Sequence, residues 1–330
     1  MPRILEKDTF EKKIMITITL PQKFSLRKAI CSTLLICSIC SFIFAQDFSN
    51  SAKSSSLSEL KGFTQKYYYS PGQENRAEHI AKLMEDAVLY FQAEIAFTPK
   101  TNMYILSPQN WKDYAAPPFH DVYGFPHNID QTNLAIAAED NDFCKSFLSK
   151  VDQLPTSVKI DVDKAYGKLD GSYSMMPFFD LLAIHEMGHS YTAQAGLKMQ
   201  RHSMSELFVN MMLHTYIAEK NPKLLPALET FPNMVISEES QKFTFTSLED
   251  FEKLYPILGM GPENYGWYQC QFHVAAKEIY NKGGKEVLIK LWTALKNHQQ
   301  EMSQEMFIKM LQKEVHPAVA DFYLNWNRRF

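Results

Sequence analysis

The chain is poor in cysteine and carries no excess of positive charge. Five of its 330 residues are cysteine, and three of these lie between residues 31 and 40. A zinc site built mainly from cysteine is therefore excluded, and the remaining Cys144 and Cys270 are expected to be buried thiols rather than a disulfide. Lys and Arg number 34 against 37 Asp and Glu, so a nucleic-acid partner is not expected from charge.

A long uncharged apolar run lies near the N-terminus. It covers residues 29–45 and follows Lys23, Arg27 and Lys28. This pattern is typical of a secretory signal peptide, so we expect residues 1–45 to be a leader cleaved after Ala45 and the protein to be exported, either to a periplasm or out of the cell. An uncleaved membrane anchor at residues 29–45 is the alternative, although this run is short for a bilayer span.

The rest of the chain has the length of one domain with two lobes. Residues 46–58 are rich in serine and are expected to form a flexible linker. Residues 59–196 mix helical and strand patterns, whereas residues 197–330 show mostly helical spacing of apolar side chains. We therefore predict an α+β fold, in which a small mixed sheet and a long helix form the first lobe and helices form the second.

The spacing of apolar residues also places individual elements. It predicts strands at residues 103–106 and 133–138, and helices at residues 77–95, 176–195, 204–220, 248–255, 271–282, 286–296, 303–314 and 317–328. The run at 133–138 is either an edge strand that pairs with a substrate or a strand of the core.

Two polar segments of the first lobe contain possible metal ligands. Residues 108–130 contain four prolines and are expected to form a long loop, with His120 and His127 as ordinary loop residues. The acidic cluster at residues 139–142 could bind Ca²⁺, but a solvated turn is the simpler interpretation.

One motif with metal-ligand spacing lies in the helix expected at residues 176–195. It reads His185-Glu186-Met187-Gly188-His189, that is, HExxH. Residues four apart share one face of a helix. Both imidazoles can therefore bind one Zn²⁺, with Glu186 beside the metal's water as general base. Gly188 has no Cβ, which we expect to let this helix approach a neighbour closely.

A catalytic zinc site needs a third protein ligand. The spacing HExxHxxGxxH is excluded, because this chain has Thr192 and Ala195 at the required Gly and His positions. Glu206, at the start of the next expected helix, is the favoured ligand, since a carboxylate that opens so apolar a helix needs a partner. An ordinary first-turn carboxylate remains the alternative. His202 is a rival ligand, whereas His214 lies too far along the helix.

HEMGH followed by SELFVN (residues 205–210, with Glu206 second) resembles the gluzincin metallopeptidases, the thermolysin-like and aminopeptidase-like group. The resemblance covers about residues 130–290 and implies a zincin-like fold, Zn²⁺ as cofactor and Glu206 as third ligand. Thermolysin-like members place an acidic residue four positions after this Glu, where it orients a ligand histidine. Asn210 stands there in this chain, and its amide oxygen can still accept a hydrogen bond from an imidazole N–H.

A donor to the oxyanion of the transition state is expected in residues 264–269 (NYGWYQ), which precede an expected helix. By similarity to the gluzincins Tyr268 takes this role, with Tyr265 as the alternate. Ordinary packing of either tyrosine is the competing interpretation. The GxMEN segment of the aminopeptidase members is absent upstream of HExxH, which favours an endopeptidase or oligopeptidase.

The sequence therefore predicts a zinc metallopeptidase that hydrolyses a peptide or protein substrate by a zinc-activated water, with Glu186 as general base. A catalytically inactive secreted binding protein on a zincin scaffold is the main alternative. It predicts loss of Glu186 or of a ligand, and neither is lost. A zinc hydrolase of non-peptide amides is a third hypothesis.

Overall fold

A computed structural model describes residues 57–117, 119–148, 151–237, 243–257 and 259–329. The predicted leader and nearly all of the predicted linker lie outside these residues. Within them, no helix combines the length and the apolar character that a bilayer crossing requires.

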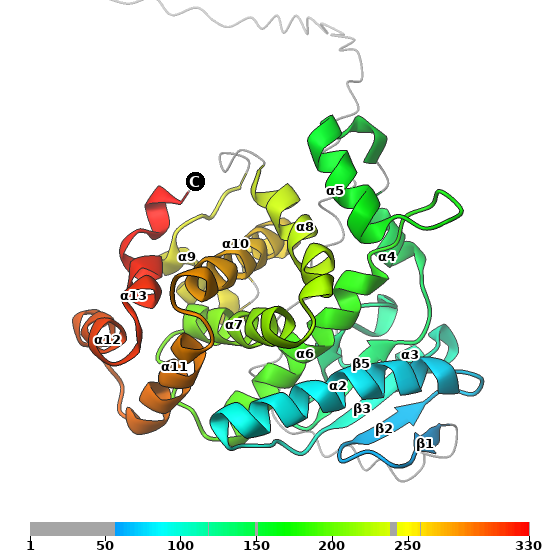
Figure 1. Ribbon diagram of the computed structural model, residues 1–330, viewed down its shortest axis with the longest axis horizontal. Coiled ribbons are helices and arrows are strands. Elements are labelled where there is room, and N and C mark those ends of the chain that lie inside the picture. The colour runs from blue at the N-terminus through cyan, green and yellow to red at the C-terminus, as the bar shows by residue number, and fades with distance from the viewer. Residues whose placement is uncertain (1–56, 118, 149–150, 238–242, 258, 330) are drawn as a thin grey trace, which may run out of the picture.

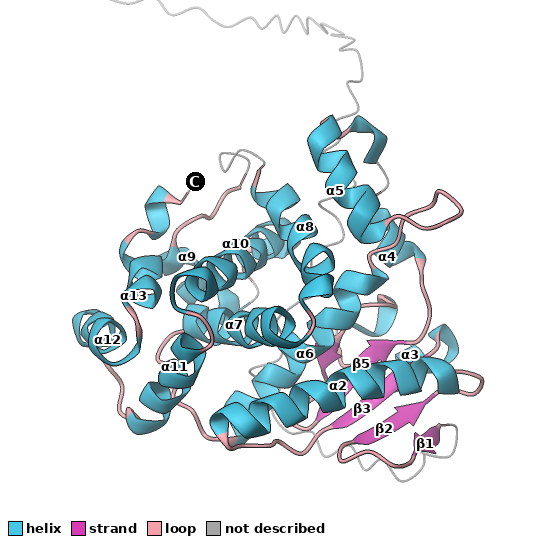
Figure 2. Cartoon of the chain, in the orientation of Figure 1, coloured by secondary structure: helices cyan, strands magenta, loops and turns pink. Residues whose placement is uncertain are grey.

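The fold is α+β, as predicted, with a five-stranded mixed sheet at one end of the molecule and helices through the rest (Figures 1 and 2). The strands are β1 (Ser58–Leu60), β2 (Lys66–Tyr69), β3 (Asn102–Leu106), β4 (His127–Asn128) and β5 (Asn133–Ala137). Their order in the sheet is β1-β2-β3-β5-β4; β2, β3 and β5 run parallel, and β1 and β4 pair antiparallel at the two edges.

The major helices follow in chain order. They are α2 (Glu74–Ile95), α3 (Pro108–Tyr114), α4 (Asp142–Ser146), α5 (Thr156–Tyr166), α6 (Met176–Gln194), α7 (His202–Lys220), α8 (Leu225–Ile236), α9 (Leu248–Leu254), α10 (Gly261–Gly283), α11 (Glu286–Asn297), α12 (Gln304–Met310) and α13 (Pro317–Leu324). Short 3-10 turns join several of them, among them η6 (Tyr255–Ile257) directly after α9.

Helix α6 joins the sheet to the helical region. It contacts β4, β5 and α2 on one side and α7 on the other, and nearly every residue from Phe178 to Thr192 is buried. Arg76 of α2 fixes its position, because the guanidinium donates to Asp180 of α6 (2.8 Å) and to the Ala137 carbonyl oxygen at the end of β5 (3.3 Å). A partly buried, bidentate ion pair of this kind holds the two helices in one register.

Buried apolar side chains form one continuous cluster from Tyr67 in β2 to Trp326 near the C-terminus. The predicted lobe boundary at residue 196 falls in the turn between α6 and α7, and the core runs across it. Gly196 has φ +65°, and the Leu197 N–H donates to the Thr192 carbonyl oxygen (3.0 Å), which ends α6 as expected.

Two expectations need correction, and one open alternative is decided. Residues 108–130 are not simply a loop, because Pro108 starts α3, where a missing N–H costs nothing, and β4 follows. Of the two alternatives for residues 133–138, the core strand is confirmed, since β3 and β4 flank β5. The helix expected at 271–282 begins ten residues earlier, at Gly261, with a proline in its first turn; residues 264–269 are therefore helical.

Candidate metal centre

Helices α6 and α7 pack unusually closely at Gly188. A Cβ built on this residue would meet Cγ1 of Val209 at 2.9 Å and Cβ of Val209 at 3.0 Å. Real side chains rarely tolerate such distances, so the close approach requires glycine here, as the sequence predicted. The approach brings the side chains of HExxH within reach of α7.

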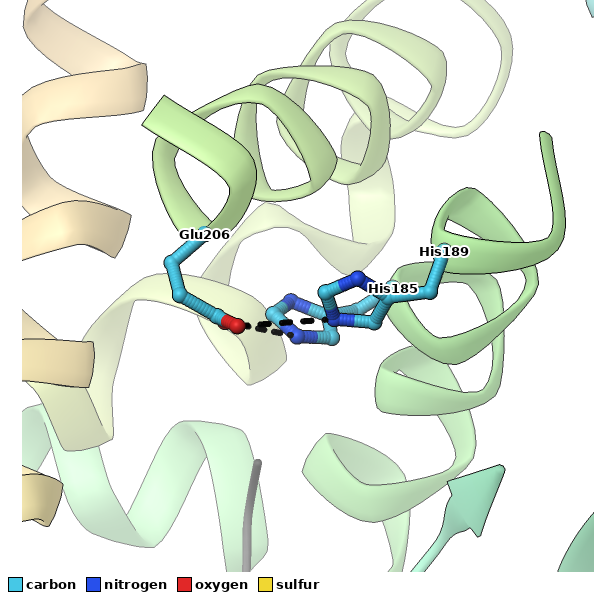
Figure 3. A group of neighbouring side chains, drawn as sticks. All are labelled: His185, His189 and Glu206. Carbon is cyan, nitrogen blue, oxygen red and sulfur yellow. Dashed lines mark ion pairs between the residues drawn. The ribbon is translucent and has the colours of Figure 1, made fainter. Parts of the chain in front are cut away.

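His185, His189 and Glu206 converge at this contact. Glu206 points from α7 toward the two imidazoles of α6 (Figure 3). The His185 Nε2 atom lies 3.5 Å from Oε2 of Glu206, and the His189 Nε2 atom lies 3.7 Å from Oε1. One ligand atom from each residue falls within 4.8 Å of the others, and all three side chains are buried. The structure thus brings together the three residues predicted as ligands.

The two Nε2 atoms are buried, and neither makes a hydrogen bond of normal geometry within the described part of the chain. Buried polar atoms are nearly always satisfied, so such a pair facing a buried carboxylate calls for a further partner. Two imidazole nitrogens and a carboxylate oxygen are donors that suit a divalent transition metal. The group could therefore hold a metal ion.

Asn210 fixes the protonation of His185. Its amide nitrogen donates to the Glu206 carbonyl oxygen (2.9 Å), one turn earlier in α7. The amide oxygen of Asn210 therefore faces His185, where it lies 3.2 Å from Nδ1. Only an Nδ1–H can bond to this oxygen, so the lone pair of His185 is on Nε2, which points at the group.

The ionisation of Glu206 and His189 suits a cation. Burial acts to raise the pKa of Glu206, but the two imidazoles and the Tyr255 hydroxyl outweigh it and lower the pKa to about 2. Burial lowers the pKa of His189 to about 4 despite the carboxylate. The pKa of His185 is raised instead, because Glu206 and Glu186 offset its burial. At neutral pH Glu206 is thus charged and His189 keeps its lone pair, as a metal requires.

Glu186, the predicted general base, is buried beside His185 in α6, with 1% of its surface exposed. A cleft of about 460 Å³ reaches the group from the side of His189. Asn128 of the edge strand β4 lines one part of the cleft, and Lys198 and Gln200 of the α6–α7 turn line another. Molecules from solvent can therefore approach the group between the sheet edge and this turn.

The two predicted tyrosines differ in position. The Tyr265 hydroxyl accepts a hydrogen bond from the Gln269 amide, which also donates to Glu206. The Tyr268 hydroxyl instead donates to the Ser247 carbonyl oxygen (2.6 Å). Tyr268 lies about 100° around α10 from Gln269, so the helix turns it away. Tyr265 is therefore connected to Glu206 through Gln269, whereas the Tyr268 hydroxyl is bonded elsewhere.

Four other histidines considered from the sequence lie outside the group. His202 packs against Tyr255, with ring centres 5.3 Å apart, and lines the cleft. The Nε2 atom of His214 lies 3.1 Å from Oε1 of Glu229. His127 is buried and accepts from the Ala116 N–H (3.0 Å), whereas His120 lies in a short 3-10 turn.

The remaining predicted features have structural roles. In the acidic turn, Asp140 pairs with Lys168, and Asn141 caps α4 by accepting from the Cys144 N–H (3.0 Å). Cys144 and Cys270 are both buried and free, as expected.

Two residues that touch the candidate ligands were not predicted. Tyr255 donates to Oε1 of Glu206 (2.7 Å), and Gln269 donates to Oε2 (2.8 Å). One pattern in the sequence could have indicated Gln269, because residues four apart, such as Tyr265 and Gln269, share one face of a helix. No local pattern indicated Tyr255, because it lies 49 residues from Glu206 in the sequence.

Compared with known protein families, with curated protein sequences and with solved structures, the chain has no match.

Proposed function

We propose that this chain is a zinc-dependent metallopeptidase with a zincin-like fold. The observation that carries the proposal is the convergence of His185, His189 and Glu206 at buried, mutually facing ligand atoms. Two imidazoles and one carboxylate form one of the ligand sets that zinc hydrolases use, and three protein ligands leave a coordination position for water or substrate. The resemblance of the sequence to gluzincins supports the same assignment.

In this proposal Glu186 and Tyr265 have different roles in the reaction. Zn²⁺ would make water acidic and polarise a substrate carbonyl. Glu186, next to His185 in α6, takes a proton from water and passes it to the leaving amine. Tyr265 donates to the substrate's carbonyl oxygen as negative charge develops there. The sequence alone favoured Tyr268, whose hydroxyl is bonded to Ser247.

The substrate class is a peptide chain. The cleft passes from the edge strand β4 to the α6–α7 turn, and an edge strand can pair with an extended peptide. Residues 133–138, the candidate edge strand from the sequence, lie one strand further in. Export, if residues 1–45 are a signal peptide, would place the activity outside the cytoplasm.

Replacement of Glu186 tests the proposal. We expect Glu186→Gln to retain one zinc per chain by elemental analysis and to cleave a mixed peptide library about 10²–10⁴-fold more slowly. The control is Glu139→Gln, which replaces an exposed carboxylate and should cleave peptides at the wild-type rate. If the wild type binds zinc and cleaves no peptide, the inactive binding protein becomes the better assignment.

A further inference from the structure

Two uncharged side chains donate hydrogen bonds to the Glu206 carboxylate. The Tyr255 hydroxyl lies 2.7 Å from Oε1, the oxygen nearer His189, and the Gln269 amide lies 2.8 Å from Oε2, the oxygen nearer His185. A carboxylate offers about four lone-pair sites. One on each oxygen is therefore taken, while each oxygen still faces an imidazole nitrogen.

Gln269 also connects Glu206 to His185, a second candidate ligand, through Asn210. Its amide oxygen lies 3.4 Å from the amide nitrogen of Asn210. Asn210 accepts from His185 Nδ1 at 3.2 Å. A continuous series of hydrogen bonds thus runs from His185 through Asn210 and Gln269 to Glu206, and it joins α6, α7 and α10.

The neutrality of these donors matters for a cation. A Lys or Arg in either place would form an ion pair with Glu206 and compete with a metal for its charge. A hydroxyl and an amide orient the carboxylate but leave its full negative charge to the cation. Both are also packed in the core: Gln269 is in the long helix α10, and Tyr255 packs against Phe251, with ring centres 5.0 Å apart.

We propose that Gln269 and Tyr255 are positioning residues of the metal centre, which hold Glu206 in the orientation that binds the ion and, through Asn210, couple it to His185. This inference rests on the proposed metal site. Neither residue touches the reacting atoms. Because partners of metal ligands commonly set the affinity for the metal, we expect their removal to weaken metal binding.

The test measures zinc affinity by competition with a chromophoric chelator. We expect Gln269→Met and Tyr255→Phe each to weaken zinc binding by about 10- to 100-fold. The absorption bands of the Co²⁺-substituted protein should also change, since they report ligand geometry. Gln269→Lys, which introduces the competing charge, should weaken binding more than Gln269→Met does.

Two control variants separate positioning from general packing. Tyr166→Phe removes a buried hydroxyl that donates to the Ala227 carbonyl oxygen at 2.8 Å, and Gln65→Met removes a buried amide that accepts from Thr101. Both should lower the melting temperature of the metal-free protein and leave zinc affinity unchanged. If Gln269→Met and Tyr255→Phe behave like these controls, the positioning role is refuted. If the wild type itself binds no zinc, the metal site and the positioning role are refuted together.

Discussion

Gly188 offers a sharp test of the contact that assembles the site. A methyl group on this residue would lie 2.9 Å from Cγ1 of Val209, against about 3.5–4.0 Å for an ordinary carbon contact. In Gly188→Ala, helices α6 and α7 must therefore separate by roughly 0.5–1 Å. Overpacking of this kind costs about 1–3 kcal/mol, offset by about 1 kcal/mol from the better helix propensity of alanine.

We expect the net loss of stability to be small and the loss of metal affinity to be large. A zinc site tolerates ligand distances within about 0.2 Å, and the separation exceeds this. Gly188→Ala should therefore bind zinc at least about tenfold more weakly, measured by chelator competition, while its urea midpoint falls only slightly.

Val209 supplies the control. Val209→Ala alone leaves a cavity and should cost about 2 kcal/mol of stability without a change in zinc affinity. The double variant Gly188→Ala/Val209→Ala removes the clash, so its zinc affinity should return toward that of the wild type. The coupling free energy between the two changes should reach about 1 kcal/mol or more. Wild-type zinc affinity in Gly188→Ala alone would refute the argument that glycine is needed for this contact.

Two further predictions concern single side chains. Burial lowers the pKa of His127 to about 4, from 6.5. Its contribution to stability is therefore present above pH 6.5 and is lost as the pH falls toward 4, by about 3 kcal/mol. In His127→Gln, the free energy of urea unfolding should therefore change less over this pH range than in the wild type. An unchanged pH profile would contradict this role of His127. Tyr265→Phe should slow peptide cleavage by about 10²-fold with little change in KM, whereas a larger effect of Tyr268→Phe would restore the assignment made from sequence.

The elements near the site could be predicted from sequence because local patterns determine them. HExxH gave two candidate ligands on one helical face, and the apolar spacing predicted a helix at residues 176–195, close to the observed α6. The apolar spacing after it placed Glu206 near the start of α7. Helix α6 is buried on nearly all sides, so its apolar character was visible without any alternation.

What could not be predicted depends on contacts between distant segments. Tyr255 and Gln269 reach Glu206 from 49 and 63 residues away, and no local pattern encodes such distances. The start of α10 was placed too late, because Gly261, Pro262 and Gly266 suggest a loop when tertiary packing is ignored. The same error hid the fact that Tyr265 and Tyr268 lie in one helix and that their hydroxyls have different partners.

The central claim is that His185, His189 and Glu206 bind one zinc ion. Titration of the metal-free protein with Zn²⁺, read by X-ray absorption at the zinc edge, tests it most directly. The account predicts one ion per chain, with nitrogen and oxygen ligands at about 2.0–2.2 Å, and loss of this site in Glu206→Ala. Absence of binding in the wild type, or an unchanged spectrum in Glu206→Ala, would contradict the account.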